Sequence, residues 1–250
     1  MMLSSVKLRI AIVTPTYRRT SFLAPFVRQV IRQDYGAWRL VIVHDGDDRQ
    51  TRDLVKGFAA RDGRIHFANT DQRANDFGIT PRLLGVKLIA NGDLADYTVF
   101  WDDDNAFFPG ALTSIVHFLE YYGMPEVLLV PVRYQNSTRP HPGPVEHLRV
   151  GQVDMANFVV RSPLAARVYE EVWQRVRRDG RPYIQDFLFL DALRRELGPG
   201  HIRQANCRPL GRYDGLRILE AMRWKLGIPY LGLSRFPWFR RLRQSVFPRR

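Results

Sequence analysis

Short apolar runs rich in β-branched residues alternate with longer stretches of helical periodicity through the N-terminal part of the chain. The predicted strands are four runs bounded by turn residues: residues 8–13, 40–43, 65–68 and 97–101. The predicted helices repeat apolar side chains at helical spacing: residues 22–33, 51–60 and 81–90. Strands that alternate with helices at this pitch form βαβ units. The sequence therefore predicts an α/β fold with a mostly parallel central sheet flanked by helices.

The second half of the chain is less regular. Residues 127–132 are apolar and predict a further strand, and residues 152–161 are expected to return to the sheet. Residues 163–178 and 184–196 have the periodicity of helices. Residues 135–147 hold three prolines within a short distance and predict a mobile loop.

Composition limits the class of protein further. The chain has 250 residues, 45% of them hydrophobic, which is enough for one substantial core. Its single cysteine, Cys207, excludes an internal disulfide framework and a zinc site of the CxxC type, and it fits a reducing compartment. The net charge of +13 attracts polyanions such as nucleic acid, anionic lipid or phosphorylated substrates.

The C-terminal segment, residues 216–250, has a composition of its own. Arginine and lysine are interleaved there with aromatic residues, and only Glu220 opposes them. This mixture favours contact with an anionic membrane surface. Two other interpretations stay open: single-stranded nucleic acid binding, and a solvated tail that packs a few aromatic residues on the domain.

The distribution of apolar residues indicates where in the cell the protein is expected. Thr14, Pro15 and Arg18 interrupt the short apolar stretch of the N-terminal segment, so no signal peptide is expected. The sequence contains no apolar run of the ~18 residues that a membrane-spanning helix needs. We expect a cytoplasmic protein, or one bound peripherally to the inner face of the plasma membrane.

Polar segments follow three of the predicted strands. They comprise residues 14–18, 44–48 and 102–105. Ligands of parallel α/β sheets bind beyond the carboxyl ends of the strands. We therefore expect these segments to converge on one edge of the sheet and to form the site.

Three consecutive carboxylates, Asp102, Asp103 and Asp104, form the most unusual of these segments. At ~6 Å and an effective dielectric of ~20, each pair repels by about 3 kcal/mol. In an extended chain Asp102 and Asp104 point to the same side, ~6.6 Å apart, and Asp103 points to the other. Two carboxylates on one side suit Mg²⁺ or Mn²⁺, which bind oxygen ligands and share them with a diphosphate.

In this order and spacing the segments resemble the nucleotide-sugar glycosyltransferases of the GT-A fold, in particular the inverting family 2 type. The matching residues are 12–18, 43–48 and 101–105, the last as the DxD motif, with 153–157 and 185–186 on the acceptor side. The resemblance covers roughly residues 8–200. It implies a GT-A domain over residues 1–215, made of a Rossmann-like nucleotide-sugar half (8–105) and an acceptor half (106–215).

The resemblance implies a role for each residue of the donor half. Thr14, Pro15 and Tyr17 line the nucleotide pocket with Arg18 nearby, and Asp45 accepts a hydrogen bond from the base, the N3–H of uracil. Asp102 contacts the ribose or the metal, and Asp104 coordinates the divalent cation, Mn²⁺ or Mg²⁺. Two further residues are expected beside the donor: Asp103, and Arg82 at a phosphate.

On the acceptor side the resemblance implies that Asp186 is the general base and that Asp154 and Asn157 contact the acceptor. A carboxylate within reach of the attacking hydroxyl takes its proton. A divalent cation stabilises the charge that builds on the leaving diphosphate. The expected reaction transfers a sugar from a nucleotide-diphosphate sugar to a hydroxyl of a glycan or lipid-linked acceptor, with inversion of the anomeric centre. The preferred candidate donor is a UDP-sugar. Whether His201 is a further metal ligand stays open.

Simpler interpretations of the same residues stay open. Asp104 or Asn105 could cap a helix at residues 109–122, and Asp45 could belong to a turn without a ligand. Asp186 could be a surface or N-cap residue, and Asp154 a charge at a strand edge.

Two other functions compete with glycosyl transfer. A sugar nucleotidyltransferase would need a Gly-rich loop with Arg or Lys near the first strand, and residues 14–17 are not such a loop. A nucleic-acid-binding protein is suggested by the charge alone, and no such module is visible, so no nucleic acid partner is expected.

Overall fold

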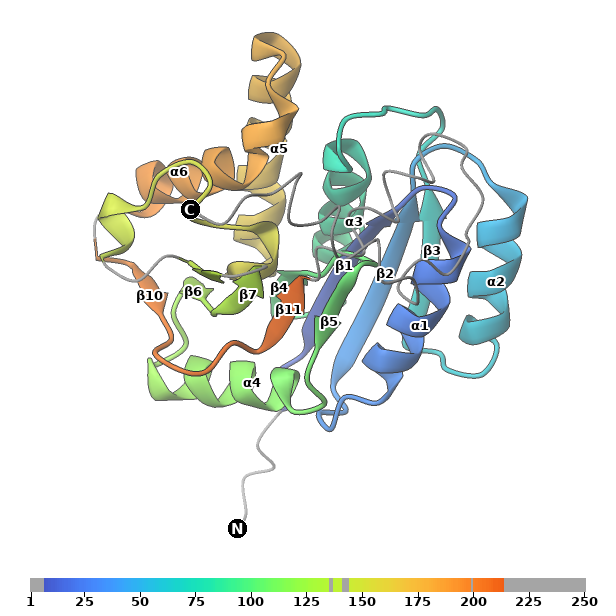
Figure 1. Ribbon diagram of the computed structural model, residues 1–250, viewed down its shortest axis with the longest axis horizontal. Helices are drawn as coiled ribbons and strands as arrows, with labels where there is room; N and C mark the ends of the chain where they lie inside the picture. The colour runs from blue at the N-terminus through green and yellow to red at the C-terminus, as the bar shows by residue number, and fades with distance from the viewer. Residues whose placement is uncertain (1–6, 135–136, 141–143, 199, 214–250) are drawn as a thin grey trace, which may run out of the picture.

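The computed structural model describes residues 7–134, 137–140, 144–198 and 200–213. Its centre is a seven-stranded sheet with the order β10-β6-β9-β4-β1-β2-β3 (Figure 1). In chain order these strands are β1 (Ile10–Thr16), β2 (Trp38–His44), β3 (Ile65–Asn69), β4 (Tyr97–Phe100), β6 (Val127–Leu129), β9 (Phe158–Arg161) and β10 (Ile202–Gln204). The C-terminal segment lies outside the described residues, so its membrane contact stays a prediction.

The sheet is mostly parallel, as the sequence predicts. Four pairings are parallel: β1 with β2, β1 with β4, β2 with β3, and β6 with β10. Only β9 runs against its neighbours, β4 and β6. The carboxyl ends of β1, β2 and β4 therefore lie at one edge of the sheet. Because β9 is antiparallel, the residues that precede it reach that same edge.

The first strand is longer than expected and runs through a proline. Pro15 pairs with Val43 of β2, whereas the pairing of β1 with β4 ends at Val13. Beyond Val13 one side of β1 has no ladder neighbour, so the missing N–H of Pro15 costs no strand hydrogen bond. The expected strand end at Val13 is therefore wrong by three residues.

Helices cover both faces of the sheet. In chain order they are α1 (Thr20–Ile31), α2 (Arg49–Ala59), α3 (Ile79–Asn91), α4 (Ala111–Tyr121), α5 (Ser162–Asp179) and α6 (Gln185–Leu197). One core contains residues of α3, α5 and α6, and the other contains residues of α1, α2 and α4. The central strands are buried on both faces: Ile10 and Ile12 belong to one core, Ala11 and Val13 to the other. Figure 1 shows α1 and α2 beside β2 and β3, and α5 and α6 at the opposite end of the sheet.

A second, four-stranded sheet lies beside the first. Its order is β5-β11-β7-β8, with β5 (Asn105–Phe107), β7 (Val132–Tyr134), β8 (Ser137–Arg139) and β11 (Gly211–Tyr213). The single strand expected at residues 127–132 is therefore two strands, β6 and β7, that belong to different sheets. Between them the Val130 N–H donates to Asn157 O, and Pro131 O accepts from the Leu210 N–H. Val130 and Pro131 therefore separate the two strands and belong to neither of them.

The proline-rich segment is more ordered than the sequence suggests. The described residues of 135–147 include β8 and a 3₁₀ turn at Val145–His147. Two further 3₁₀ turns occupy Met155–Asn157 and Pro182–Ile184. The expectation of a loop throughout is wrong for these residues, because β8 pairs with β7. None of the helices among the described residues is long and apolar enough to span a membrane.

Gly85 allows α3 to pack closely on the sheet. A Cβ at this position would lie 2.7 Å from Val13 Cγ1 and 3.4 Å from a methyl group of Val43. We expect Gly85→Ala to lower the free energy of unfolding by about 1–3 kcal/mol, the usual cost of overpacking a core. Denaturant unfolding measures the change.

Gly57 in α2 is the matched control, because a Cβ there meets nothing within 4 Å. Gly57→Ala is expected to stabilise the protein by about 0.5–1 kcal/mol, since alanine is the better helix former. Equal effects of the two substitutions would contradict the close contact at Gly85.

Candidate active site

The aspartate segment is a turn and not a strand end. β4 ends at Phe100, the Asn105 N–H donates to Asp102 O at 3.0 Å, and Asn105 Oδ1 accepts from the Asp102 N–H at 3.0 Å. The extended geometry expected for this segment is therefore wrong. In the turn Asp103 and Asp104 face the same cation, Arg19, whereas Asp102 faces Arg82. The capping interpretation is also wrong, because α4 begins at Ala111 without a side-chain cap.

Arg19, at the start of α1, neutralises the buried part of the aspartate segment. Its guanidinium bonds to Asp103 and lies 3.1 Å from Asp104 Oδ2. Thr16 Oγ1 donates to Asp103 Oδ2 at 2.7 Å. Burial raises the pKa of Asp103 to about 7, although Arg19 opposes this shift. Sequence reasoning missed Arg19; the signal was that three carboxylates at a buried edge require cations close by.

Arg82 connects Asp102 to the other half of the site. It projects from α3 and is almost fully buried. Its Nη2 donates to Asp102 Oδ1 at 2.5 Å, and its Nη1 donates to Gln185 Oε1 and to Phe77 O, both at 3.1 Å. Arg82 Nε is buried, and no residue in the described part of the chain forms a hydrogen bond with it. Contact with a phosphate stays a prediction, and the contacts in this structure are to protein groups.

Tyr17 and Asp45 lie at the ends of β1 and β2, where the nucleoside is expected. Arg73 covers the Tyr17 ring, with its guanidinium carbon 4.1 Å from the ring centroid. The buried Asp45 carboxylate accepts from the backbone N–H groups of Ala74 at 2.7 Å and Asn75 at 2.9 Å. Asp45 therefore fixes the segment that carries Arg73, a residue that no sequence signal indicated.

The remaining residues of this region hold the strand ends together. Thr14 Oγ1 donates to Trp101 O at 2.8 Å, which ties β1 to the end of β4. Arg18 has a positive φ of 48° and donates its N–H to His44 Nε2 at 2.8 Å. The proton of His44 therefore lies on Nδ1, which donates to Gly46 O at 2.8 Å. His44 is the last residue of β2, and these two hydrogen bonds give it a structural role.

Asp154 and Asn157 form a capping box on the turn that precedes β9. Asp154 Oδ1 accepts from the Ala156 N–H, and Asn157 Oδ1 accepts from the Asp154 N–H. Asn157 is fully buried, and its amide also donates to Val130 O and Arg139 O. Both the oxygen and the nitrogen of the Asn157 amide are thus bonded to the protein backbone. Asp154 Oδ2 lies 3.8 Å from Arg139 Nη1.

Asp186 lies in the first turn of α6 and is not its cap. The helix has no side-chain hydrogen bond at its N-terminus. Burial raises the pKa of Asp186 well above its usual value, the negative charge of Asp154 raises it further, and Arg82 lowers it. Burial also raises the pKa of Asp154. The antiparallel β9 and the start of α6 therefore bring two carboxylates from distant parts of the chain to the edge that carries Asp102.

The residues fit a divalent cation at one position. Among the described residues there is no group of three or more His, Cys, Asp and Glu arranged to hold a metal ion. Asp102 and Asp103 are already paired with arginines. Asp104 Oδ1, however, is buried and has no hydrogen-bond partner among the described residues, and burial raises the pKa of this carboxyl. An oxygen of this kind is a suitable cation ligand, with further ligands supplied by a diphosphate and water.

His201 is exposed and precedes β10, which runs parallel to β6. His201 therefore lies at the opposite edge of the sheet from Asp104, and it does not belong to this site.

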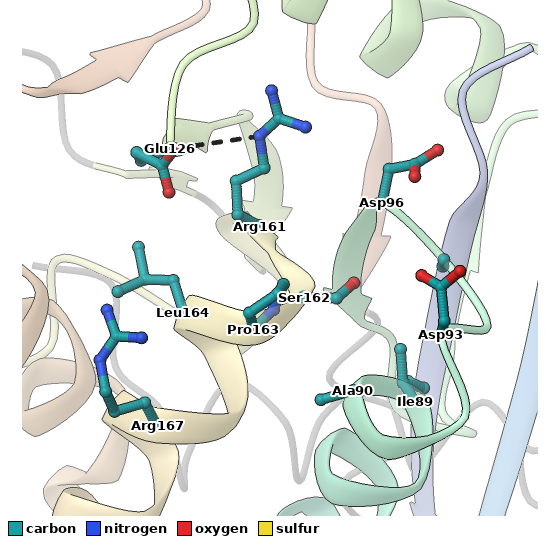
Figure 2. Close-up of a pocket in the computed structure, with 11 residues that line it drawn as sticks. Ile89, Ala90, Asp93, Asp96, Glu126, Arg161, Ser162, Pro163, Leu164 and Arg167 are labelled. Atoms are coloured by element: carbon teal, nitrogen blue, oxygen red, sulfur yellow. Dashed lines mark ion pairs between the residues drawn. The ribbon is translucent and has the colours of Figure 1, made fainter. Parts of the chain in front are cut away.

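The edge of the sheet opposite Asp104 also contains a cavity of about 330 Å³ (Figure 2). Its lining has charges of both signs, including Asp93, Asp96, Glu126 and Arg161, and none of the predicted site residues.

Comparisons with known proteins agree with this architecture. The family model described as glycosyl transferase family 2 matches residues 11–163. Among solved structures, S. aureus TarS 1-349 in complex with UDP has a TM-score of 0.62 and 17% identity over 86% of this chain and 64% of that chain. The complex with UDP-GlcNAc has a TM-score of 0.61 and 16% identity over 82% and 58%. The chain thus spans less than two thirds of these relatives, and no curated protein matches it in sequence.

The fold and the arrangement of its strand ends define the class: an α/β fold of the GT-A glycosyltransferase type. The expected fold is therefore confirmed. Since the family model matches more than half of its residues, the chain belongs to glycosyl transferase family 2.

Proposed function

We propose that the protein transfers a sugar from a nucleotide-diphosphate sugar to a hydroxyl group of a glycan or lipid-linked acceptor, with inversion. The observation that carries the proposal is Arg82, which joins Asp102 of the donor half to the segment that carries Asp186. Donor carboxylates and a carboxylate of raised pKa thereby meet at one edge of the sheet. Inversion requires a base on the face opposite the leaving group, and two separate carboxylate groups suit that geometry.

A uridine donor is supported by the relatives. TarS is described in complexes with UDP and with UDP-GlcNAc. In this chain Tyr17 offers a ring for stacking on the base. Both oxygens of Asp45 already accept backbone N–H groups, and Oδ1 also accepts from the Thr70 hydroxyl at 3.5 Å, so Oδ2 keeps a second lone pair for the N3–H of uracil.

In this proposal Asp104, with Asp102 beside it, holds a divalent cation, Mn²⁺ or Mg²⁺. Such a cation stabilises the charge of the leaving diphosphate. Asp186 takes the proton of the acceptor hydroxyl, and its raised pKa makes it a stronger base once it is ionised. Residues 216–250 would bring the enzyme to an anionic membrane surface where a lipid-linked or polysaccharide acceptor is found.

The first test is donor binding. The protein is incubated with Mn²⁺ and a panel of nucleotide sugars, and thermal unfolding and nucleotide diphosphate release are followed. At least one UDP-sugar is expected to raise the unfolding temperature and to release UDP. If no nucleotide sugar protects the protein, with or without metal, the proposal fails. Release of pyrophosphate from a nucleoside triphosphate and a sugar phosphate would favour a nucleotidyltransferase.

Asp104→Asn is expected to weaken UDP binding in the presence of Mn²⁺ by at least about tenfold, because it removes the charge of a proposed metal ligand. Binding without metal should change little. The measurement is a calorimetric titration of UDP with and without Mn²⁺. Asp53→Asn is the matched control, since Asp53 is exposed on α2 and forms an ion pair with Arg49 at 3.4 Å. Equal affinity losses with and without Mn²⁺ would contradict a metal ligand at Asp104.

A further inference from the structure

The Gln185 side chain is enclosed by partners that fix the orientation of its amide. Its Oε1 accepts from Arg82 Nη1 at 3.1 Å and from the Tyr169 hydroxyl at 3.0 Å. Its Nε2 donates to Phe77 O at 3.2 Å. Two donors face the oxygen and an acceptor faces the nitrogen, so only an amide satisfies all three contacts. Gln185 is buried, as are Arg82 and Tyr169.

Arg82 depends on this amide for its position. Arg82 Nη1 donates to Gln185 Oε1 and to Phe77 O, and Phe77 O is in turn held by Gln185 Nε2. Phe77 itself has a positive φ of 60°, a strained conformation for an aromatic residue. The three residues thus close a ring of hydrogen bonds, and the second amino group of Arg82 is left to point at Asp102.

Charged groups of both signs act on Asp186, and the carboxylates outnumber the guanidinium groups. Asp154, from the turn before β9, and Asp102, from the turn after β4, raise its pKa. Arg82 of α3 and Arg139 of β8 lower it, and the neutral Tyr169 hydroxyl of α5 faces the same cluster. Three carboxylates therefore share two guanidinium groups. A fourth carboxylate at position 185 would compete for Arg82 and would add a negative charge directly beside Asp186.

We propose that Gln185 is a positioning residue for sugar transfer: its neutral amide, next in the chain to Asp186, holds the Arg82 guanidinium against Asp102 of the donor half. This inference rests on the proposed function. An amide suits this position because it orients the guanidinium by a hydrogen bond without drawing its charge away from either aspartate. The positive charge of Arg82 then opposes the rise in the pKa of Asp186 that burial and the neighbouring carboxylates cause.

Gln185→Glu tests the inference, because it keeps the shape of the side chain and adds one charge. The Cγ resonance of Asp186 is followed by NMR in protein with labelled aspartate, and Asp186→Asn identifies the signal. We expect the titration midpoint of Asp186 to rise by about one pH unit in Gln185→Glu, the size of shift that a neighbouring like charge produces. An unchanged midpoint would overturn the proposal. Gln174→Glu, at an exposed position of α5, adds the same charge and should leave the midpoint unchanged.

Turnover distinguishes positioning from a purely structural role. With UDP-GlcNAc and Mn²⁺ as probe, the acidic limb of the pH profile of UDP release should move to higher pH in Gln185→Glu. Release near neutral pH should fall about tenfold and recover as the pH is raised, while UDP affinity stays within about threefold. A loss that is equal at every pH would contradict the proposal. If the wild-type protein binds no nucleotide sugar, the proposed function fails, whereas an unmoved midpoint in a protein that binds UDP defeats only the inference.

If Gln185→Glu does not fold, Tyr169→Phe replaces it. The variant removes one of the two donors to Gln185 Oε1 without changing any charge. We expect UDP release to fall about three- to tenfold, the value of one hydrogen bond, at unchanged UDP affinity. Wild-type release in Tyr169→Phe would overturn the proposal.

Discussion

Replacing Asp186 by asparagine is expected to lower the rate of sugar transfer by about 10³-fold while UDP affinity changes by less than about threefold. Asparagine keeps the size of the side chain and cannot accept a proton. Asp186 is the candidate base because its carboxylate lies at the edge of the sheet that carries Asp102, and because burial and Asp154 raise its pKa. The donor residues Tyr17 and Asp45 belong to other strand ends, so they should be unaffected.

The measurement combines steady-state UDP release with calorimetric titration of UDP in the same variant. Because the pKa of Asp186 is raised, the base form accumulates only above this raised value, so the wild-type rate should increase with pH through it. Asp191→Asn is the matched control: Asp191 lies on the same helix and pairs with Arg175 at 2.9 Å on the surface. Equal losses of UDP affinity and rate in Asp186→Asn would contradict the separation of donor site and base.

Replacing Arg19 by methionine is expected to lower the free energy of unfolding by about 3–5 kcal/mol, the cost of leaving a buried charge without its partner. Methionine keeps most of the apolar length of the arginine side chain. Arg19 bonds to Asp103, whose side chain is fully buried, and to Asp104 at 3.1 Å. Without Arg19 these two adjacent carboxylates would lose their shared cation, and Asp103 would keep its hydrogen bond from the Thr16 hydroxyl.

The loss of unfolding free energy in Arg19→Met should be larger at high pH than at low pH. Burial raises the pKa of Asp103 to about 7 in the folded protein, above the ordinary aspartate value of about 3.8, so the folded state holds more protons across this interval. Stability from this group therefore falls as pH rises from about 4 to about 7. Arg19→Met raises the folded pKa further, so the variant should be destabilised more near pH 8 than near pH 5, where protonation relieves the repulsion.

Denaturant unfolding of both proteins at the two pH values measures this difference. Arg18→Met is the matched control, because the Arg18 side chain is 57% exposed and lies 3.6 Å from Asp48. Its substitution should cost less than about 1 kcal/mol, as for other surface ion pairs. A destabilisation of Arg19→Met that does not change with pH would refute the buried pairing with Asp103.

Local patterns in the sequence were sufficient for the first half of the fold. The β1–β4 strands and the helices between them follow from apolar periodicity, because each element is defined by residues a few positions apart. The same reasoning placed the polar segments at one edge of the sheet, since the carboxyl ends of parallel strands meet there. It did not find the second sheet, because each of its strands has only three residues and β11 pairs with β5 and β7 across long distances in the chain.

Local sequence patterns were enough to assign the α/β class, the family and the edge at which the polar residues meet. Which partner each of these residues has follows from the tertiary structure. The turn at Asp102 turns Asp103 toward Arg19, the antiparallel β9 brings Asp154 to the donor edge, and α6 places Gln185 against Arg82. The spacing of apolar residues reports only on neighbouring residues, whereas these contacts join residues that are far apart in the chain. Burial then makes each pairing decisive, because a charge at this edge has little water to replace a missing partner.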